Sequence, residues 1–254
     1  MNRDATSLVD PDEFDQFAEG EMEIEGRMPW SSNATFLVQL KGLTGSVDEP
    51  VLKGIYKPFK GERPLWDFPD GLYRREAAAF ELAAFLGWDV IPRTIVRDGT
   101  FGLGSVQWFV DADFEQHYFT MMENRPELLE QLRTLAVFDL LANNADRKGG
   151  HVLVLAASSP EAGPDTIWGI DNGLCFHDEP KLRTVMWDFA GDMIPKVLLP
   201  DIERLASLSE TSDPFGELLT DNECGALIER AQKILRKPVY PRPTSNYAYP
   251  WPMV

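Results

Sequence analysis

The stretch between Phe138 and Gly173 constrains the chain most, because it places two carboxylates at the ends of two different kinds of element. Asp146 follows an apolar, helix-like segment and opens a basic loop with two glycines. Asp171 follows a short apolar, strand-like segment and opens a turn. Phosphoryl transfer from ATP needs two such carboxylates, one to orient the attacking hydroxyl and one to hold Mg²⁺ on the phosphates.

Length and charge limit the classes of protein that this chain can belong to. Its 254 residues suffice for one large domain or for two lobes with a hydrophobic core. A formal net charge of −17 disfavours nucleic acid, whose phosphates require a basic surface, and simple docking on anionic lipid. Two cysteines make neither a disulfide framework nor a metal knuckle. The polar N-terminus and the short apolar runs predict no signal peptide and no integral membrane segment, so we expect a cytoplasmic protein.

The first half of the chain has the alternating, β-branched pattern of strands, interrupted by one alanine-rich helix. The helix is expected from Leu72 to Leu86, where Gly87 ends it. The strands are expected at Glu21 to Met28, Thr35 to Leu40, Val51 to Tyr56, Ile91 to Val96 and Ser105 to Val110.

Helical periodicity dominates the second half. Helices are expected from Pro126 to Asn143, over Leu198 to Leu208, and after the capping box Thr220-x-x-Glu223, with an irregular loop at 174–197. The order predicts an α+β fold with a sheet-rich first half and a mainly helical second half. Its expected parts are a flexible acidic arm (1–20), a first lobe (21–110), a second lobe (111–237) and an extended tail rich in Pro and Tyr (238–254).

Several segments resemble those of one superfamily. Asp146-Arg147-x-x-x-His151, followed by Ile170-Asp171-Asn172-Gly173, is similar to the catalytic and metal-binding segments of the phosphatidylinositol 3-/4-kinase-like superfamily, which includes HipA-type protein kinases. Upstream, Gly54-Ile-Tyr-Lys57-Pro58 resembles the strand that carries the ATP-binding lysine. Arg75-Glu76 resembles the start of the helix whose glutamate pairs with that lysine, and 105–110 resembles the hinge between lobes. The resemblance covers roughly residues 21–190, and the segments follow the order that the family has. Within the superfamily, the chain resembles a small bacterial branch.

The resemblance implies a two-lobed protein-kinase-like fold that uses ATP with Mg²⁺ or Mn²⁺. Lys57, held by Glu76, would neutralise the phosphates, and Asp171 with His151 would bind the metal. Asp146 would orient the acceptor hydroxyl, while Arg147 or Lys148 would offset developing negative charge. The remaining residues expected at the nucleotide are Ser31, Ser32, Gln107, Phe109 and Val110.

Two departures from the family pattern bear on function. His151 stands where the family has a metal-binding asparagine, and Mg²⁺ prefers oxygen to imidazole. His151 would therefore bind a metal such as Mn²⁺, or only hydrogen-bond the loop, or mark a site that binds nucleotide but transfers phosphate poorly. No basic lipid-binding loop follows Gly173, which favours a protein or small-molecule hydroxyl as acceptor over a lipid.

Each segment also has an ordinary structural interpretation. Asp146-Arg147 alone is typical of a solvated surface pair, and Asp171-Asn172-Gly173 of a hairpin turn. Two other functions remain open: a nucleotide-sensing pseudokinase or scaffold, and a metal-dependent hydrolase with Asp146, His151 and Asp171 as ligands. The hydrolase would leave Lys57 and Glu76 without a role. The sequence has no G-x-x-x-x-G-K-[ST] loop, which excludes a Walker-type site.

Overall fold

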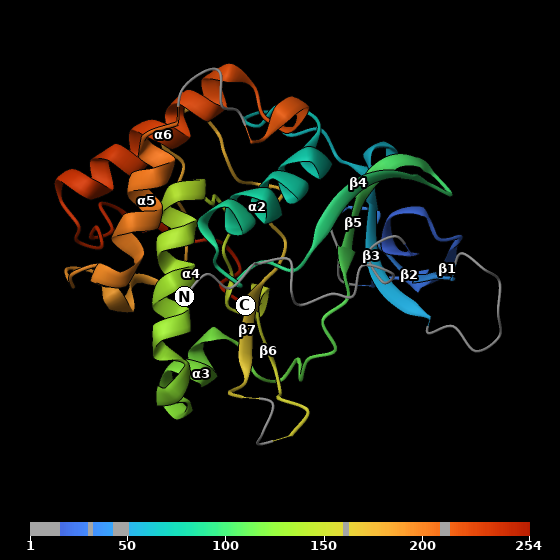
Figure 1. Cartoon of the computed structure of the whole chain (residues 1–254), viewed down its shortest axis with the longest axis horizontal. Coiled ribbons are helices and arrows are strands. Elements are labelled where there is room, and N and C mark those ends of the chain that lie inside the picture. Colours follow the sequence, from blue (N-terminus) through green and yellow to red (C-terminus); the bar gives the residue numbers. More distant parts are fainter. Residues whose placement is uncertain (1–15, 30–32, 43–50, 160–162, 209–213) are drawn as a thin grey trace.

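A computed structural model describes residues 16–29, 33–42, 51–159, 163–208 and 214–254 (Figure 1). Within these ranges the chain divides into an antiparallel sheet from the first half and a mainly helical body from the second. The expected α+β fold is thereby confirmed. No helix in the described part is both long and apolar enough to cross a membrane.

The N-terminal sheet has five strands in the order β1-β2-β3-β5-β4, every neighbouring pair antiparallel, within the described residues. Alternate residues of β2 and β3 are buried, and Val38, Leu40 and Tyr56 form the centre of its apolar core. The strands are β1 (Met22–Arg27), β2 (Phe36–Leu40), β3 (Leu52–Pro58), β4 (Thr94–Gly99) and β5 (Gly102–Trp108). Strand β4 begins three residues later than predicted, because Ile91 and Pro92 belong to the turn that leads into the sheet, and β5 begins three residues earlier than predicted.

Helix α2 (Leu72–Leu86) packs between the sheet and the helical body and contacts β4 and β5 (Figure 1). It ends where predicted, because Gly87 takes the left-handed conformation, φ 73°, that L-residues avoid. Two charged side chains of this helix are buried: Arg75, which pairs with Glu223, and Glu76, which faces the sheet. Burial of two charges on one helix turn requires partners for both.

The helical body surrounds the largest apolar core of the described chain. The capping box at Thr220 is formed: Glu223 N–H donates to Thr220 Oγ1 at 3.3 Å and Thr220 N–H donates to Glu223 Oε2 at 2.9 Å. Residues 126–128 form a separate 3₁₀ turn ahead of α4, and α3 lies in a segment for which the sequence predicts no helix. The helices are α3 (Tyr118–Asn124), α4 (Leu129–Ala142), α5 (Leu199–Ala206) and α6 (Asp221–Arg236). A hairpin of β6 (Val152–Leu155) and β7 (Thr166–Gly169) completes this half.

Both predicted terminal segments are more ordered than expected where they are described. Residues 16–19 are helical, and Phe17, 2% exposed, packs into the core of the N-terminal sheet. Part of the segment expected as a flexible arm, residues 16–19, is therefore helical and packs against the N-terminal sheet. The tail is not freely extended, because it folds back on the body: Ala248 is buried, and Gly149 N–H donates to Met253 O at 2.7 Å. The C-terminus accordingly lies beside the β6–β7 hairpin (Figure 1).

Candidate active site

Lys57 lies near the end of β3 and connects the two halves of the molecule. Its ammonium pairs with Glu76 Oε1 and lies 2.7 Å from Asp171 Oδ1. Burial works against the charge, but the two carboxylates outweigh that effect, so the pKa of Lys57 lies well above its ordinary value. A permanently charged amine is thus held at the junction of the sheet and the helical body.

Glu76 is fixed at both carboxylate oxygens. Oε1 accepts from Lys57, and Oε2 accepts from Asn172 N–H at 2.9 Å. The residue is 3% exposed, so neither bond competes with bulk water. Glu76 therefore links the amine of β3 to the segment that follows β7.

Asp171 has the left-handed backbone conformation, φ 57°, which aspartate tolerates better than most residues. Such backbone outliers cluster at functional sites. Its side chain is half-exposed, with Oδ1 toward Lys57 and Oδ2 3.3 Å from His151 Nε2. Lys57 holds the pKa of Asp171 well below its ordinary value, against the opposing effect of burial. The carboxylate is therefore ionised and accessible.

Asp146 lies at the opening of the loop after α4. Its N–H donates to Asn144 Oδ1 at 2.9 Å, and its Oδ2 lies 3.1 Å from Lys148 Nζ. Burial raises the pKa of Asp146, and Lys148 partly offsets that rise. Asp146 and Lys148 line one cavity of about 420 Å³ together with Lys57, Glu76, His151 and Asp171. The structure therefore brings together six of the residues singled out from the sequence.

His151 is neutral at pH 7, because burial lowers its pKa to about 4 despite the nearby carboxylate of Asp171. Its Nδ1 accepts from Lys148 N–H at 3.5 Å, which leaves the proton on Nε2, the atom that faces Asp171. A metal held here would take one carboxylate from Asp171 and one imidazole from His151, a set that suits Mn²⁺ better than Mg²⁺. The described residues hold no group of three or more such side chains placed for a metal, so the hydrolase site made by Asp146, His151 and Asp171 is not found.

Arg147 does not have the predicted role in offsetting charge on the phosphates. Its side chain is fully buried and forms a paired contact with Asp139, with Nε 3.0 Å from Oδ2 and Nη2 2.9 Å from Oδ1. It also donates to Ile170 O and to Asn172 Oδ1, each at 2.7 Å. With its donors directed into the protein, Arg147 fixes the loops that carry Asp146 and Asp171. Lys148, in contrast, lies beside Asp146, with Nζ 3.1 Å from its Oδ2.

Three other residues expected at the nucleotide, Gln107, Phe109 and Val110, do not line this cavity. Ser31 and Ser32 lie outside the described residues, although the adjoining Asn33, Ala34 and Thr35 line the cavity. The side chains of Gln107 and Val110 are buried, and Gln107 Nε2 donates to Thr94 Oγ1 at 3.0 Å. Phe109 N–H donates to Lys53 O at 3.1 Å. In the predicted hinge, the side chains of Gln107 and Val110 and the N–H of Phe109 therefore make their contacts within the protein.

Two residues that organise the site were not singled out from the sequence. Asp139 is fully buried on α4, and its carboxylate holds both Arg147 and Asn144 Nδ2. Asn172, also fully buried, joins Arg147 to Glu76 through its side chain and its N–H. A carboxylate on the apolar stripe of a helix was the available signal for Asp139, because a buried acid requires a buried partner.

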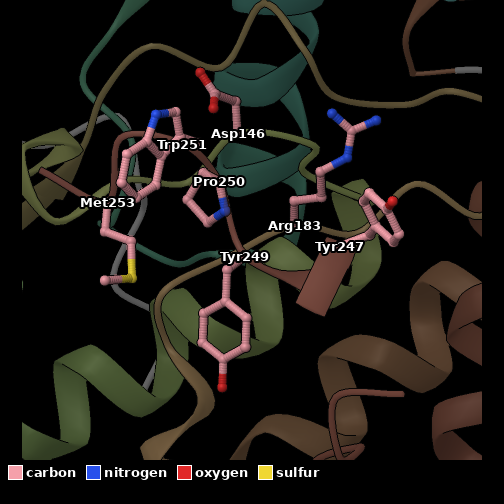
Figure 2. A pocket seen from close by; sticks show the side chains of 7 residues that line it. All are labelled: Asp146, Arg183, Tyr247, Tyr249, Pro250, Trp251 and Met253. Atoms are coloured by element: carbon pink, nitrogen blue, oxygen red, sulfur yellow. The ribbon is translucent and has the colours of Figure 1, made fainter. Parts of the chain in front are cut away.

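Asp146 also lines a second cavity, of about 410 Å³ (Figure 2). Apart from Asp146 and Arg183, its lining comes from the C-terminal tail. In Figure 2, Trp251 and Met253 lie on one side of Pro250, and Arg183 and Tyr247 lie on the other. The predicted catalytic carboxylate thus borders two cavities.

Comparison with known proteins supports the fold and gives the family. No family model matches the sequence. The structure of hydra Fam20 with sugar has a TM-score of 0.57 at 14% identity, covering 93% of this chain and 95% of that one. The Golgi casein kinase with Mn and ADP bound has a TM-score of 0.53 at 14% identity, covering 95% of this chain and 79% of that one. The predicted kinase-like fold is confirmed by these likenesses.

A relative in sequence is protein Rv2133c of Mycobacterium tuberculosis, which is 38% identical over 279 aligned residues. The alignment covers 95% of this chain and 95% of that protein. Identity at this level over nearly the whole length shows common descent, whereas the structural likenesses show the fold alone. The chain has a protein-kinase-like fold and belongs to the family of Mycobacterium tuberculosis protein Rv2133c.

Proposed function

We propose that this protein is an ATP- and divalent-metal-dependent phosphotransferase that transfers the γ-phosphate to a hydroxyl of a protein or small molecule. The observation that carries the proposal is the set formed by Lys57, Glu76 and Asp171, which joins the sheet to the helical body in the same cavity as Asp146. This arrangement matches the needs of phosphoryl transfer, in which the protein mainly positions the reactants and stabilises charge.

Each residue has a role that follows from its position. Lys57 supplies a positive charge to the nucleotide phosphates, and Glu76 keeps its ammonium in place. Asp171 and His151 would hold a divalent cation, which when bound neutralises charge on the phosphates. Asp146 accepts a hydrogen bond from the acceptor hydroxyl and orients it, and Lys148 reduces negative charge beside it.

The order of these residues along the chain supports placing the protein near the phosphatidylinositol 3-/4-kinase-like superfamily and its HipA-type members. The Golgi casein kinase, whose fold is similar, has a structure with Mn and ADP bound. We extend to this chain the same kinds of ligand, a nucleotide and a divalent ion. The net charge of −17 favours a protein or small-molecule acceptor over an anionic lipid.

A nucleotide-binding pseudokinase is the second candidate, and His151 is the observation that favours it. Its Nε2 carries the proton that faces Asp171, so metal binding through this nitrogen requires that the proton first leave. The chain would then bind nucleotide through Lys57 while transferring phosphate slowly.

Two measurements test the function and separate the candidates. Thermal unfolding with ATP and Mg²⁺ or Mn²⁺ is expected to show nucleotide-dependent stabilisation that Asp171→Asn removes. Radiolabelled ATP incubated with the protein and cell extract is expected to give transfer that Asp146→Asn abolishes. Stabilisation unchanged by Asp171→Asn contradicts the metal site, and binding without Asp146-dependent transfer favours the pseudokinase.

A further inference from the structure

The C-terminal tail is attached to the protein at both sides of the Asp146 loop. Ala248 O accepts hydrogen bonds from Thr184 N–H and from Trp187 Nε1, each at 3.1 Å. Closer to the C-terminus, Met253 O accepts a hydrogen bond from Gly149 N–H at 2.7 Å. Gly149 lies three residues after Asp146 in the chain. The tail between these contacts is therefore held across the predicted catalytic loop.

The tail places large apolar side chains in the open beside a carboxylate. Trp251 and Tyr247 are each 88% exposed, and Tyr249 is 39% exposed. Exposed apolar groups gathered at a cavity mark a binding site more often than singly scattered ones do. The Asp146 side chain keeps 26% of its surface exposed, so the tail forms a wall beside it and does not seal it.

Asp146 is the residue that the linings of the two cavities share among the described residues. The first cavity holds Lys57 and Asp171, and the second is bounded by the tail and Arg183. A phosphate donor in the first cavity and a hydroxyl in the second would therefore both lie next to Asp146.

We propose that the tail cavity is the acceptor site, and that the acceptor is a small hydroxyl-bearing molecule with a ring, such as a sugar or a nucleoside. This inference rests on the proposed phosphotransferase function. A volume of about 410 Å³ lies in the lower part of the range for small-molecule pockets, roughly 300–1,000 Å³. Aromatic side chains with a few converging polar groups are the lining that such ligands require.

The chemistry of recognition follows from the lining. Trp251 offers a ring face against which a ligand ring stacks, and Arg183 donates to the oxygens of the ligand. The Tyr249 ring points away from Asp146 (Figure 2) and packs edge-on against Trp187. The acceptor hydroxyl donates to Asp146. In the reaction, a bond forms between the hydroxyl oxygen and the γ-phosphorus as the bond from that phosphorus to the β,γ-bridging oxygen breaks. ADP leaves with the bridging oxygen, and the hydroxyl proton passes to the Asp146 carboxylate.

Binding of named probes tests the inference separately from nucleotide chemistry. Glucose, ribose and cytidine are titrated in saturation-transfer NMR against the full chain, first without nucleotide and then with ADP and Mg²⁺. We expect at least one probe to bind in both conditions, and Trp251→Ala to weaken that binding by about tenfold or more. Separate titrations of the two sugars and of the nucleoside show which of these two classes of ligand the cavity binds. Trp66→Ala is the matched control, because Trp66 is 96% exposed and lines neither cavity.

Each outcome has a defined meaning. The inference is overturned if none of the probes binds, if binding survives Trp251→Ala, or if only cytidine binds and ADP displaces it. A higher rate of ATP hydrolysis in Trp251→Ala also overturns the inference, because it would mean that the tail blocks access to Asp146. Absence of stabilisation by ADP, with Trp251-dependent probe binding intact, contradicts the proposed function and leaves the tail site in place.

Discussion

Lys57 Nζ lies 2.7 Å from Asp171 Oδ1, so a cation on β3 and a carboxylate after β7 meet across the junction of the two halves. The second contact of Lys57, to Glu76, is buried, whereas the Asp171 carboxylate is half-exposed. An entering phosphate group can therefore take the place of Asp171 at the ammonium without leaving Glu76 unpaired. The position of Asp171 beside Lys57 is therefore one where an anion such as a phosphate group can bind.

Removal of the Lys57 amine is expected to weaken nucleotide binding. A hydrogen bond to a charged group contributes about 1.5–3 kcal/mol, which corresponds to roughly a ten- to hundredfold rise in the dissociation constant of ATP for Lys57→Met. Isothermal titration calorimetry with ATP and Mn²⁺ measures this change. Lys53→Met, on the same strand but with its side chain about half-exposed, serves as the control and should bind as the unsubstituted protein does. Equal affinities for the two variants would remove Lys57 from the site.

Asp146→Asn is expected to separate transfer from binding. Asparagine keeps the size of the side chain but cannot take the hydroxyl proton, and loss of a positioned acid or base lowers rates by roughly 10²–10⁴-fold. The dissociation constant of ATP should stay unchanged, because Lys57 and Asp171 are intact. The rate of label transfer and the calorimetric affinity are measured on the same preparation. Asp178 is an exposed acid that lines neither of the two cavities bordered by Asp146, so Asp178→Asn should leave both quantities unchanged.

Lys148 is expected to affect how the rate of phosphate transfer falls at acidic pH, in the acidic limb of the pH profile. Asp146 has to be unprotonated to accept the hydroxyl proton, so transfer falls as the pH drops through its pKa, which burial places above the ordinary value. Lys148 lowers that pKa, and Lys148→Met therefore shifts the limb to higher pH. The measurement is the rate of transfer across the acidic pH range, with the exposed Lys196→Met as control. A limb that stays in place, or moves to lower pH, contradicts the assignment of Asp146.

The buried pair of Arg147 and Asp139 is expected to control stability. Removal of one partner of a buried ion pair costs about 3–5 kcal/mol, because the remaining charge is left without compensation. Arg147→Leu should lose that much in free energy of unfolding, measured by urea denaturation, whereas the exposed Arg236→Leu should change it by less than about 0.5 kcal/mol. The double variant Arg147→Leu/Asp139→Leu should lose less than the sum of the single losses. Additive losses would show that the two side chains act independently.

Local patterns in the sequence were sufficient to predict most of the helices and strands and part of the site. Gly87 ended α2 and Thr220 began α6 because short-range hydrogen bonding and backbone conformation decide such boundaries. Lys57 and Asp171 were identified because the segments that carry them resemble the lysine-bearing and metal-binding segments of one kinase-like superfamily. The order of segments along the chain then predicted that they would converge.

Contacts between distant segments could not be predicted in the same way. The resemblance assigned Arg147 to the phosphates. Its partner Asp139 lies eight residues earlier, within α4, and no local pattern reveals that the two side chains meet in the interior. The tail has no periodic pattern, and its position depends on a backbone hydrogen bond from Gly149 to Met253. Backbone contacts of this kind leave no mark on residue type.

Substitution of His151 tests which metal the site prefers. Asparagine offers an oxygen ligand in place of an imidazole, and Mg²⁺ prefers oxygen more strongly than Mn²⁺ does. His151→Asn is therefore expected to increase the stabilisation by ADP in Mg²⁺ relative to that in Mn²⁺, measured as the ratio of the two thermal shifts. His177→Asn is the control, because His177 faces Asp178 and does not line the Lys57 cavity. An unchanged ratio in His151→Asn would limit His151 to its hydrogen bond with Lys148 N–H and its contact with Asp171, and would leave Asp171 as the metal-binding side chain of the pair.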